Sequence, residues 1–116
     1  MKALVTAVVF TASLITASAA MSMMSITEFT ANKANKQKWG ATVIYLNGVG
    51  VGATVAAATL IKQNKPTLFC QPEEIVLGQK DYIKLINVFI SKNELPDETP
   101  VETALIMALI TAFPCN

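Results

Sequence analysis

The stretch from residue 69 to residue 115 reads FCQPEEIVLGQKDYIKLINVFISKNELPDETPVETALIMALITAFPC, and it holds both cysteines of the chain, Cys70 and Cys115. Between the cysteines the pattern predicts two helices separated by an acidic loop. A bond between the two sulfur atoms would close this helical hairpin into a ring. We take the hairpin as the unit that decides the fold.

The second helix of the hairpin has the clearest start signal in the sequence. Thr99 can cap it, Pro100 suits the first helical position, and Glu102 follows three residues after the cap, which predicts a capping box. From residue 101 to residue 113 nearly every residue is apolar, and Pro114 ends the helix. A helix without a polar face must be surrounded by other elements, so we expect it at the centre of the core.

The first helix of the hairpin, expected over residues 77–91, is amphipathic. At about 100° per residue its apolar side chains fill one arc, which should pack on the second helix; they are Tyr82, Ile83, Leu85, Ile86, Phe89 and Ile90. Upstream, Ser25 or Thr27 can cap a short helix that runs towards Lys38, and residues 39–61 form a further helix. No segment shows strand alternation, so we predict an all-α fold, a small bundle of four to five helices.

The first 19 residues have the composition of a secretory signal peptide. Lys2 supplies a positive start, residues 3–15 are apolar, and Ala17 and Ala19 place small side chains where a signal peptidase reads them. We expect cleavage after Ala19, which leaves residues 20–116 as a single helical domain in the periplasm. The alternative for this segment is an N-terminal membrane helix.

Export decides how the two cysteines are interpreted. Two thiols in an oxidising compartment pair, whereas in the cytosol they usually stay free. We therefore predict a disulfide between Cys70 and Cys115, which by chain entropy stabilises the fold by about 4 kcal/mol at this spacing. A redox-active pair is the alternative, but the two cysteines lack the C-x-x-C spacing that tunes such thiols.

Charge is balanced overall but divided unevenly along the chain. After signal cleavage, the part up to Cys70 carries five lysines and one glutamate, and the remainder carries three lysines and seven carboxylates. The chain has no arginine and no basic stripe, so we expect no nucleic-acid partner. The asymmetry can hold the two halves together, or it can present an acidic face to a basic partner.

Residues 39–61 carry no charge, and this length is enough to span a bilayer. Against a span, threonines, glycines and Asn47 dilute the apolarity, and the signal peptide and disulfide favour a helix of an exported domain. Gly48 and Gly52 lie four residues apart, which predicts a smooth helix face that another backbone can approach. We expect no membrane association after cleavage; a small membrane protein spanning residues 39–61 is the alternative.

The sequence lacks the residues and spacings that most catalytic and metal sites use. The chain has no histidine, the commonest general base and metal ligand. Glu73 and Glu74 are adjacent and would diverge on a helix, so they do not form a catalytic pair. The glycines at 48, 50 and 52 lack the spacing and flanking elements of a phosphate-binding loop. We predict a protein that is not an enzyme and that uses no metal or cofactor.

Five short motifs occur in a fixed order along the mature chain: Tyr45-Leu46-Asn47-Gly48-Val49, Phe69-Cys70-Gln71-Pro72, Gly78-Gln79 with Phe89-Ile90, Ala104-Leu105-Ile106 with Ala108-Leu109, and Phe113-Pro114-Cys115. In this order they resemble the Rap/Tai family of immunity proteins, which protect bacteria against peptidoglycan amidase toxins delivered by type VI secretion. The two cysteine motifs are the most specific part. The chain departs from the family in the Gly50-Val51-Gly52 run and in a longer acidic segment before Pro100.

The resemblance implies a periplasmic, mostly helical, disulfide-bonded protein, often a homodimer, that binds and blocks a cell-wall amidase through a protruding loop. Here the expected partner-binding loop consists of Glu94, Leu95, Pro96, Asp97 and Glu98. Its carboxylates would face the partner, and Leu95 and Pro96 would form a rigid apolar tip. The alternatives are an ordinary solvated loop and, for the whole chain, a periplasmic helical protein with another binding or chaperone function.

Overall fold

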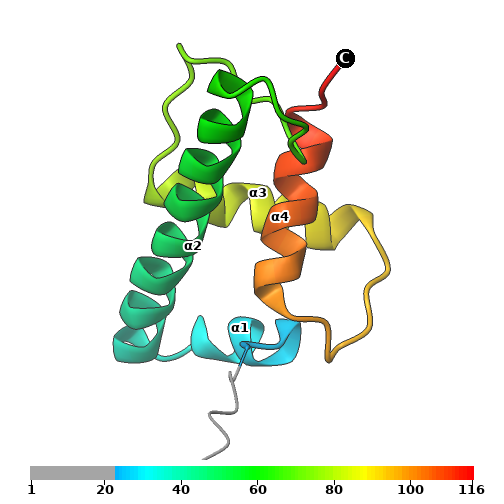
Figure 1. The fold of residues 1–116 in the computed structure, drawn as a ribbon. Coiled ribbons are helices and arrows are strands. Elements are labelled where there is room, and N and C mark those ends of the chain that lie inside the picture. Colours follow the sequence, from blue (N-terminus) through cyan, green and yellow to red (C-terminus); the bar gives the residue numbers. More distant parts are fainter. Residues whose placement is uncertain (1–22) are drawn as a thin grey trace, which may run out of the picture.

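The computed structural model of the protein describes residues 23–116, which form four α-helices (Figure 1). Helix α1 spans Ile26–Asn32, α2 spans Lys36–Lys62, α3 spans Gln79–Lys92 and α4 spans Val101–Ala112. The prediction of a small all-α bundle is confirmed. The expected signal peptide, residues 1–19, lies outside the described residues.

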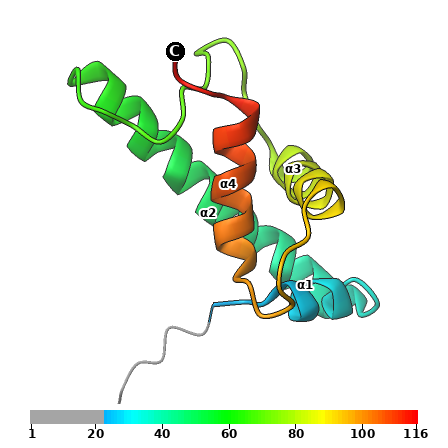
Figure 2. The ribbon, with the colours of Figure 1, turned by 90° about the vertical axis from the view of Figure 1, so that its right-hand side faces the viewer.

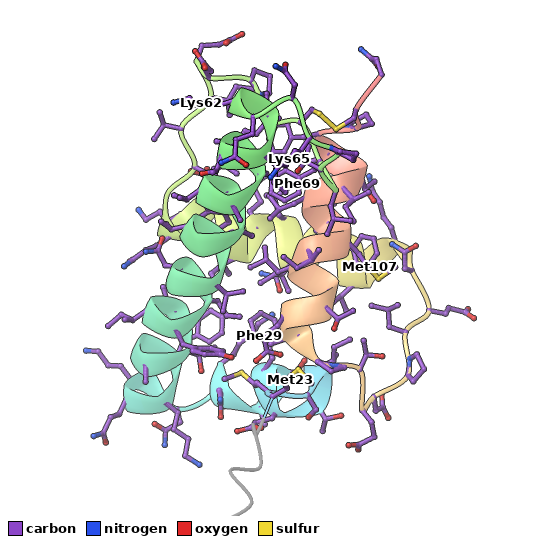
Figure 3. The ribbon with its side chains drawn as sticks, viewed as in Figure 1. Met23, Phe29, Lys62, Lys65, Phe69 and Met107 are labelled. Carbon is purple, nitrogen blue, oxygen red and sulfur yellow. A yellow bond between two sulfur atoms is a disulfide. The ribbon has the colours of Figure 1, made fainter. Side chains whose placement is uncertain are left out.

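Helices α2 and α4 run beside each other, α3 crosses behind both, and α1 lies across the end at which α2 begins (Figures 1 and 2). The core between them is filled by large side chains from every helix and from the segment before α3: Phe29, Leu46, Phe69, Tyr82, Ile86, Leu105 and Leu109. Figure 3 shows Phe29 and Phe69 between α2 and α4. Lys62, Lys65 and Met107 are exposed. Helix α4 packs against both α2 and α3, and, as predicted, the apolar arc of α3 faces it.

The short N-terminal helix does not continue to Lys38, because two capping residues divide this part of the chain. The Ser25 hydroxyl accepts a hydrogen bond from the Glu28 N–H at 3.1 Å and starts α1. Asn35 then accepts from the Lys38 N–H at 3.0 Å and starts α2 after a break of three residues. An asparagine in extended conformation can serve as a new N-cap, so α2 leaves in its own direction.

The predicted capping box at the start of α4 is wrong. Pro100 is the N-cap residue and Thr99 makes no side-chain cap bond. The carboxylate of Glu102 instead turns away from its own helix, and its Oε1 accepts from the Tyr45 hydroxyl at 2.7 Å and from the Met24 N–H at 3.1 Å. Glu102 therefore ties α4 to α2 and to the segment before α1, since partners brought by the fold compete with a local cap.

Helix α2 has one buried stripe and one exposed face. The stripe that enters the core consists of Thr42, Leu46, Gly50 and Ala57. By length and composition alone α2 could cross a membrane, and only 17% of its most apolar 18-residue window is buried in the fold. It is therefore not enclosed in the way that a central core helix is.

The sequence predicts a close approach to this helix at Gly48 and Gly52. In the structure the close approach occurs at Gly50 instead. A Cβ atom built on Gly50 would lie 2.5 Å from two ring carbons of Tyr82, whereas one built on Gly48 or Gly52 would meet nothing within 4 Å. Gly50 thus lets the aromatic ring of α3 lie directly on the α2 backbone. Gly48 and Gly52 belong to the exposed face.

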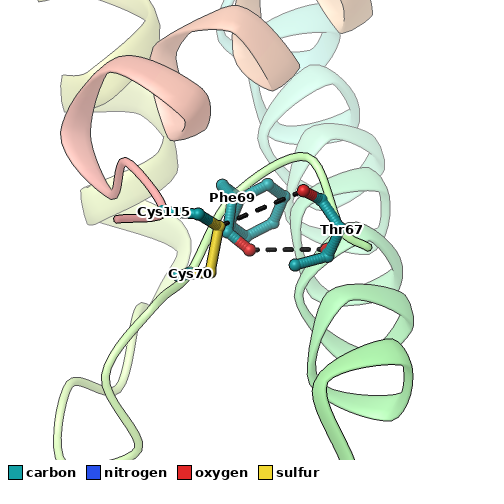
Figure 4. Close-up of a disulfide and its surroundings, with 4 residues drawn as sticks. All are labelled: Thr67, Phe69, Cys70 and Cys115. Carbon is teal, nitrogen blue, oxygen red and sulfur yellow. Dashed lines mark hydrogen bonds between the residues drawn. A yellow bond between two sulfur atoms is a disulfide. The ribbon is translucent and has the colours of Figure 1, made fainter. Parts of the chain in front are cut away.

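The predicted disulfide between Cys70 and Cys115 is present, with a Cα–Cα distance of 5.0 Å (Figure 4). Beside it the Cys70 N–H donates to the Phe113 carbonyl oxygen at 2.8 Å, and the ring of Phe69 is buried. The Cys115 sulfur also lies 4.0 Å from the Thr67 carbonyl oxygen, a contact without a shared proton because both thiols are oxidised. The bond joins the end of α4 to the segment before α3 and indicates an oxidising compartment.

Candidate partner-binding site

The acidic loop between α3 and α4 exposes four of its five predicted contact residues. Glu94, Pro96, Asp97 and Glu98 are exposed. Leu95 is half-buried and packs on the cluster formed by Phe89, Ala104 and Ala108. The expected apolar tip is therefore reduced to Pro96, because Leu95 turns inwards and anchors the loop. A single apolar residue among charges is the sequence signal that could have identified this anchor.

Hydrogen bonds fix the loop backbone at both ends. At its start the Asn93 side chain donates to the Phe89 carbonyl oxygen at 2.8 Å, and near its end the Thr99 N–H donates to the Pro96 carbonyl oxygen at 3.0 Å. The first turn of α1 also holds it, since the N–H and the hydroxyl of Thr27 both donate to the Asp97 carbonyl oxygen at 3.3 Å. A loop held in this way loses little conformational entropy when it binds a partner.

The three exposed carboxylates of the loop lie between α3, which ends at Lys92, and α4, which begins at Val101. The positive end of the α4 dipole favours negative charge near Asp97 and Glu98, whereas Glu94 follows the negative end of α3. The loop gathers Glu94, Asp97 and Glu98 in one short segment. The result is a negatively charged, solvated projection that a basic surface can approach.

The motifs that carry the family resemblance hold the fold together and do not lie at this loop. Phe69 is in the core and Cys70 is in the disulfide. Gln71 donates through Nε2 to the Ile75 carbonyl oxygen at 2.7 Å, and its Oε1 accepts from the Thr54 hydroxyl at 3.3 Å. The Phe69-Cys70-Gln71-Pro72 motif therefore shapes the segment before α3.

The α2–α3 crossing leaves an open groove on each side, and neither was predicted from the sequence. One groove, of about 570 Å³, lies between the C-terminal half of α2 and the segment before α3; its apolar wall includes Val51, Val55, Ile61, Ile75 and Val76. The other, of about 470 Å³, lies between the N-terminal half of α2 and α3. Both arise because two helices that cross steeply contact each other only near the crossing, and their apolar sides then diverge.

In the part of the chain that the structure describes, no group of three or more histidine, cysteine, aspartate or glutamate side chains could hold a metal ion. A comparison with models of protein families finds no matching family, and comparisons with curated proteins and with solved structures find no match either.

Proposed function

We propose that the protein is a periplasmic immunity protein that binds and blocks a peptidoglycan amidase delivered by type VI secretion. The observation that carries the proposal is the acidic loop, which is exposed, fixed at both ends and projects three carboxylates. The motif order around the two cysteines supports the choice of partner. The disulfide fits the periplasm, which is where such an amidase meets the cell wall.

In this proposal the loop enters the amidase cleft and prevents substrate from entering. Glu94, Asp97 and Glu98 pair with basic groups at the cleft rim, which speeds encounter and fixes the orientation of the complex. Pro96 supplies a rigid contact between the charges. Leu95 anchors the loop by packing on the apolar cluster of α3 and α4 and does not contact the partner.

The test compares two triple variants that remove the same charge. In the first, Glu94, Asp97 and Glu98 are replaced by serine while Leu95 is retained. In the matched control, serine replaces three exposed carboxylates outside the loop: Glu28, Glu73 and Glu74. Each is co-expressed with the amidase encoded by the adjacent reading frame, directed to the periplasm, and cell lysis is measured.

We expect the loop variant to lose protection and the control to protect as the natural protein does. Helix content by circular dichroism and mobility on a non-reducing gel should be the same in both variants. Full protection by the loop variant would show that the binding surface lies outside the loop. An adjacent reading frame that encodes no amidase, together with failure to protect against any amidase toxin, would refute the function itself.

The proposal includes reversible pairing of two copies through the exposed face of α2, which we define as Ile44, Tyr45, Gly48, Val51, Gly52 and Val55. Ile44 is 67% exposed and Val55 is 59% exposed. No charged residue of α2 lies between Lys38 and Lys62, so the two helix faces bring no charge of their own into contact. The two exposed glycines leave room for a second backbone to approach.

The lysines at the two ends of α2 do not prevent this pairing. Lys38 and Lys62 are each about 18 Å along the helix from Gly50, the midpoint between them. Helices that cross at this midpoint diverge, which keeps the lysines of the two copies beyond the Debye length of about 8–10 Å. One helix face can bury less surface area than the roughly 800 Å² per partner of a standard protein–protein interface, so we expect a weak dimer.

Light scattering over a range of protein concentrations tests the dimer. Val55→Lys should stay monomeric at concentrations where the natural protein pairs, whereas Leu68→Lys, at a 68% exposed position outside this face and outside both grooves, should pair normally. Carbonate extraction should release the mature protein from membranes. A monomer at all concentrations, or retention in the membrane pellet, would contradict this part of the proposal.

A further inference from the structure

The groove between the N-terminal half of α2 and α3 combines an apolar floor with a basic rim; we name it the lysine-rimmed groove. Its floor is formed by Trp39 and Val43 of α2 and by Ile83 and Val88 of α3. Its rim is formed by Gln79, Lys80, Lys84 and Asn87. The steep crossing of α3 behind α2, visible in Figure 1, leaves this floor open to solvent.

Positive charge around the groove is not neutralised by its own lining, which includes no carboxylate. A third lysine closes one end: the Lys33 Nζ donates to the Asn87 Oδ1 at 2.6 Å and lies 5.9 Å from the centre of the Trp39 ring. Its partners are a neutral amide and the rings of Phe29, at 4.7 Å, and Trp39, so no carboxylate among them neutralises its charge. The nearest acidic residue in sequence, Asp81, accepts from the Gly78 N–H at 2.7 Å at the start of α3.

The larger groove on the other side of the crossing is lined by charges of both signs. Its lining carries one lysine, Lys62, and one glutamate, Glu73. Its polar floor is also internally paired, because the Thr54 and Tyr82 hydroxyls lie 3.2 Å apart and Thr54 contacts Gln71. Nothing there favours one kind of occupant, so the two grooves differ in what they can recognise.

We propose that the lysine-rimmed groove binds a segment of a partner protein in which one or two apolar side chains are flanked by carboxylates. The apolar side chains cover Trp39, Val43 and Val88, and the carboxylates pair with Lys80, Lys84 and Lys33. A protein segment suits the groove better than a small molecule, because small ligands are held in pockets that enclose most of their surface and this groove is open. The lining of the groove includes no residue of the acidic loop, and the inference does not depend on the amidase proposal.

Trp39 makes the proposal directly measurable, since it is the one tryptophan of the sequence and it lies in the floor of the groove. The probe is the blocked peptide EELLEE, titrated into the mature, oxidised protein while tryptophan emission is followed. Covering the indole should shift its emission to shorter wavelength and saturate, and the shift should weaken as salt is raised. The peptides KKLLKK and EESSEE should give no saturable shift, because each lacks one of the two required features.

Charge reversal supplies the decisive variant and its matched control. Lys80→Glu with Lys84→Glu should weaken peptide binding by about tenfold or more, because like charges would face each other across the groove. Lys62→Glu with Lys65→Glu makes the same change in net charge at exposed positions at and just beyond the C-terminal end of α2, and it should leave the affinity within about twofold. The loop variant that lacks Glu94, Asp97 and Glu98 should also bind the peptide normally, which separates this proposal from the amidase proposal.

Three results would overturn the inference. The first is the absence of a saturable shift with EELLEE up to millimolar concentration. The second is equal weakening in the two lysine double variants, which would reduce the effect to net charge. The third is a shift produced by phosphatidylglycerol vesicles but not by the peptide, which would identify a lipid-binding face.

Discussion

Replacing Gly50 with alanine tests the packing on which the bundle depends. A Cβ atom at this position would lie 2.5 Å from Cδ1 and Cε1 of Tyr82 and 2.7 Å from its Cζ, distances that Cβ atoms do not tolerate. The ring cannot move aside easily, because Tyr82 is only 2% exposed and its hydroxyl lies 3.2 Å from that of Thr54. Either α2 and α3 must separate, or the ring must leave its position.

Two opposing contributions set the size of the effect. Alanine in a helix interior is favoured over glycine by roughly 0.5–1 kcal/mol. Overpacking of a core contact costs about 1–3 kcal/mol, and loss of the tyrosine–threonine hydrogen bond costs about 1 kcal/mol more. We therefore expect Gly50→Ala to lower the free energy of unfolding by roughly 1–3 kcal/mol, since the cost exceeds the gain in propensity.

Gly52→Ala is the matched control, because it makes the same change on the same helix where nothing lies within 4 Å of the new methyl group. It should raise the free energy of unfolding by roughly 0.5–1 kcal/mol. Urea denaturation of the oxidised, dilute protein, followed by circular dichroism, measures both values. Equal stabilisation by the two substitutions would refute the reasoning, since it would show that the Tyr82 ring is not packed on the α2 backbone.

Three further predictions follow from other contacts. Cys115→Ser should lower the free energy of unfolding by about 2–5 kcal/mol in denaturant titrations, and the denatured, unreduced natural protein should show no free thiol. Ser25→Ala should cost about 1 kcal/mol in the same assay because it removes the cap of α1, whereas Thr99→Ala should change stability by less than about 0.5 kcal/mol. The hydrogen bond from Tyr45 to Glu102 raises the pKa of Tyr45, and burial and the charge of Glu102 add to this effect. The stability that the protonated Tyr45 hydroxyl contributes is therefore complete below about pH 10 and is lost as pH rises through the raised pKa. Tyr45→Phe should abolish this loss when unfolding is measured from about pH 8 to about pH 11.5.

Local patterns predicted the helices because each pattern acts within a few residues. The amphipathic arc of residues 77–91 and the apolar run from residue 101 correspond to α3 and α4 within two residues at most boundaries. The same patterns did not determine whether each polar side chain bonds within its own helix or to a distant segment. Glu102 suited a capping box by spacing, but the fold brings Tyr45 and Met24 to its carboxylate, and these bonds replace the local one.

The candidate site shows the same division. Composition identified the acidic loop, and the structure confirms that Glu94, Pro96, Asp97 and Glu98 are exposed. The inward turn of Leu95 follows from the apolar cluster of α3 and α4 beneath it, which exists only once the two helices are packed. The lysine-rimmed groove had no sequence signal, because its lining comes from two helices separated by more than 15 residues and meets only at their crossing.

The sequence by itself determined the helical class from short-range periodicity and the division into a basic and an acidic half from composition. It also predicted the pairing of the two cysteines, which the structure confirms, from the oxidising compartment that the predicted export signal implies. Only the tertiary structure decided that Gly50 receives Tyr82, that Glu102 joins three segments and that one face of α2 stays exposed. Each of these outcomes depends on the angle and position at which two helices cross, and that geometry is set by side chains far apart in the sequence.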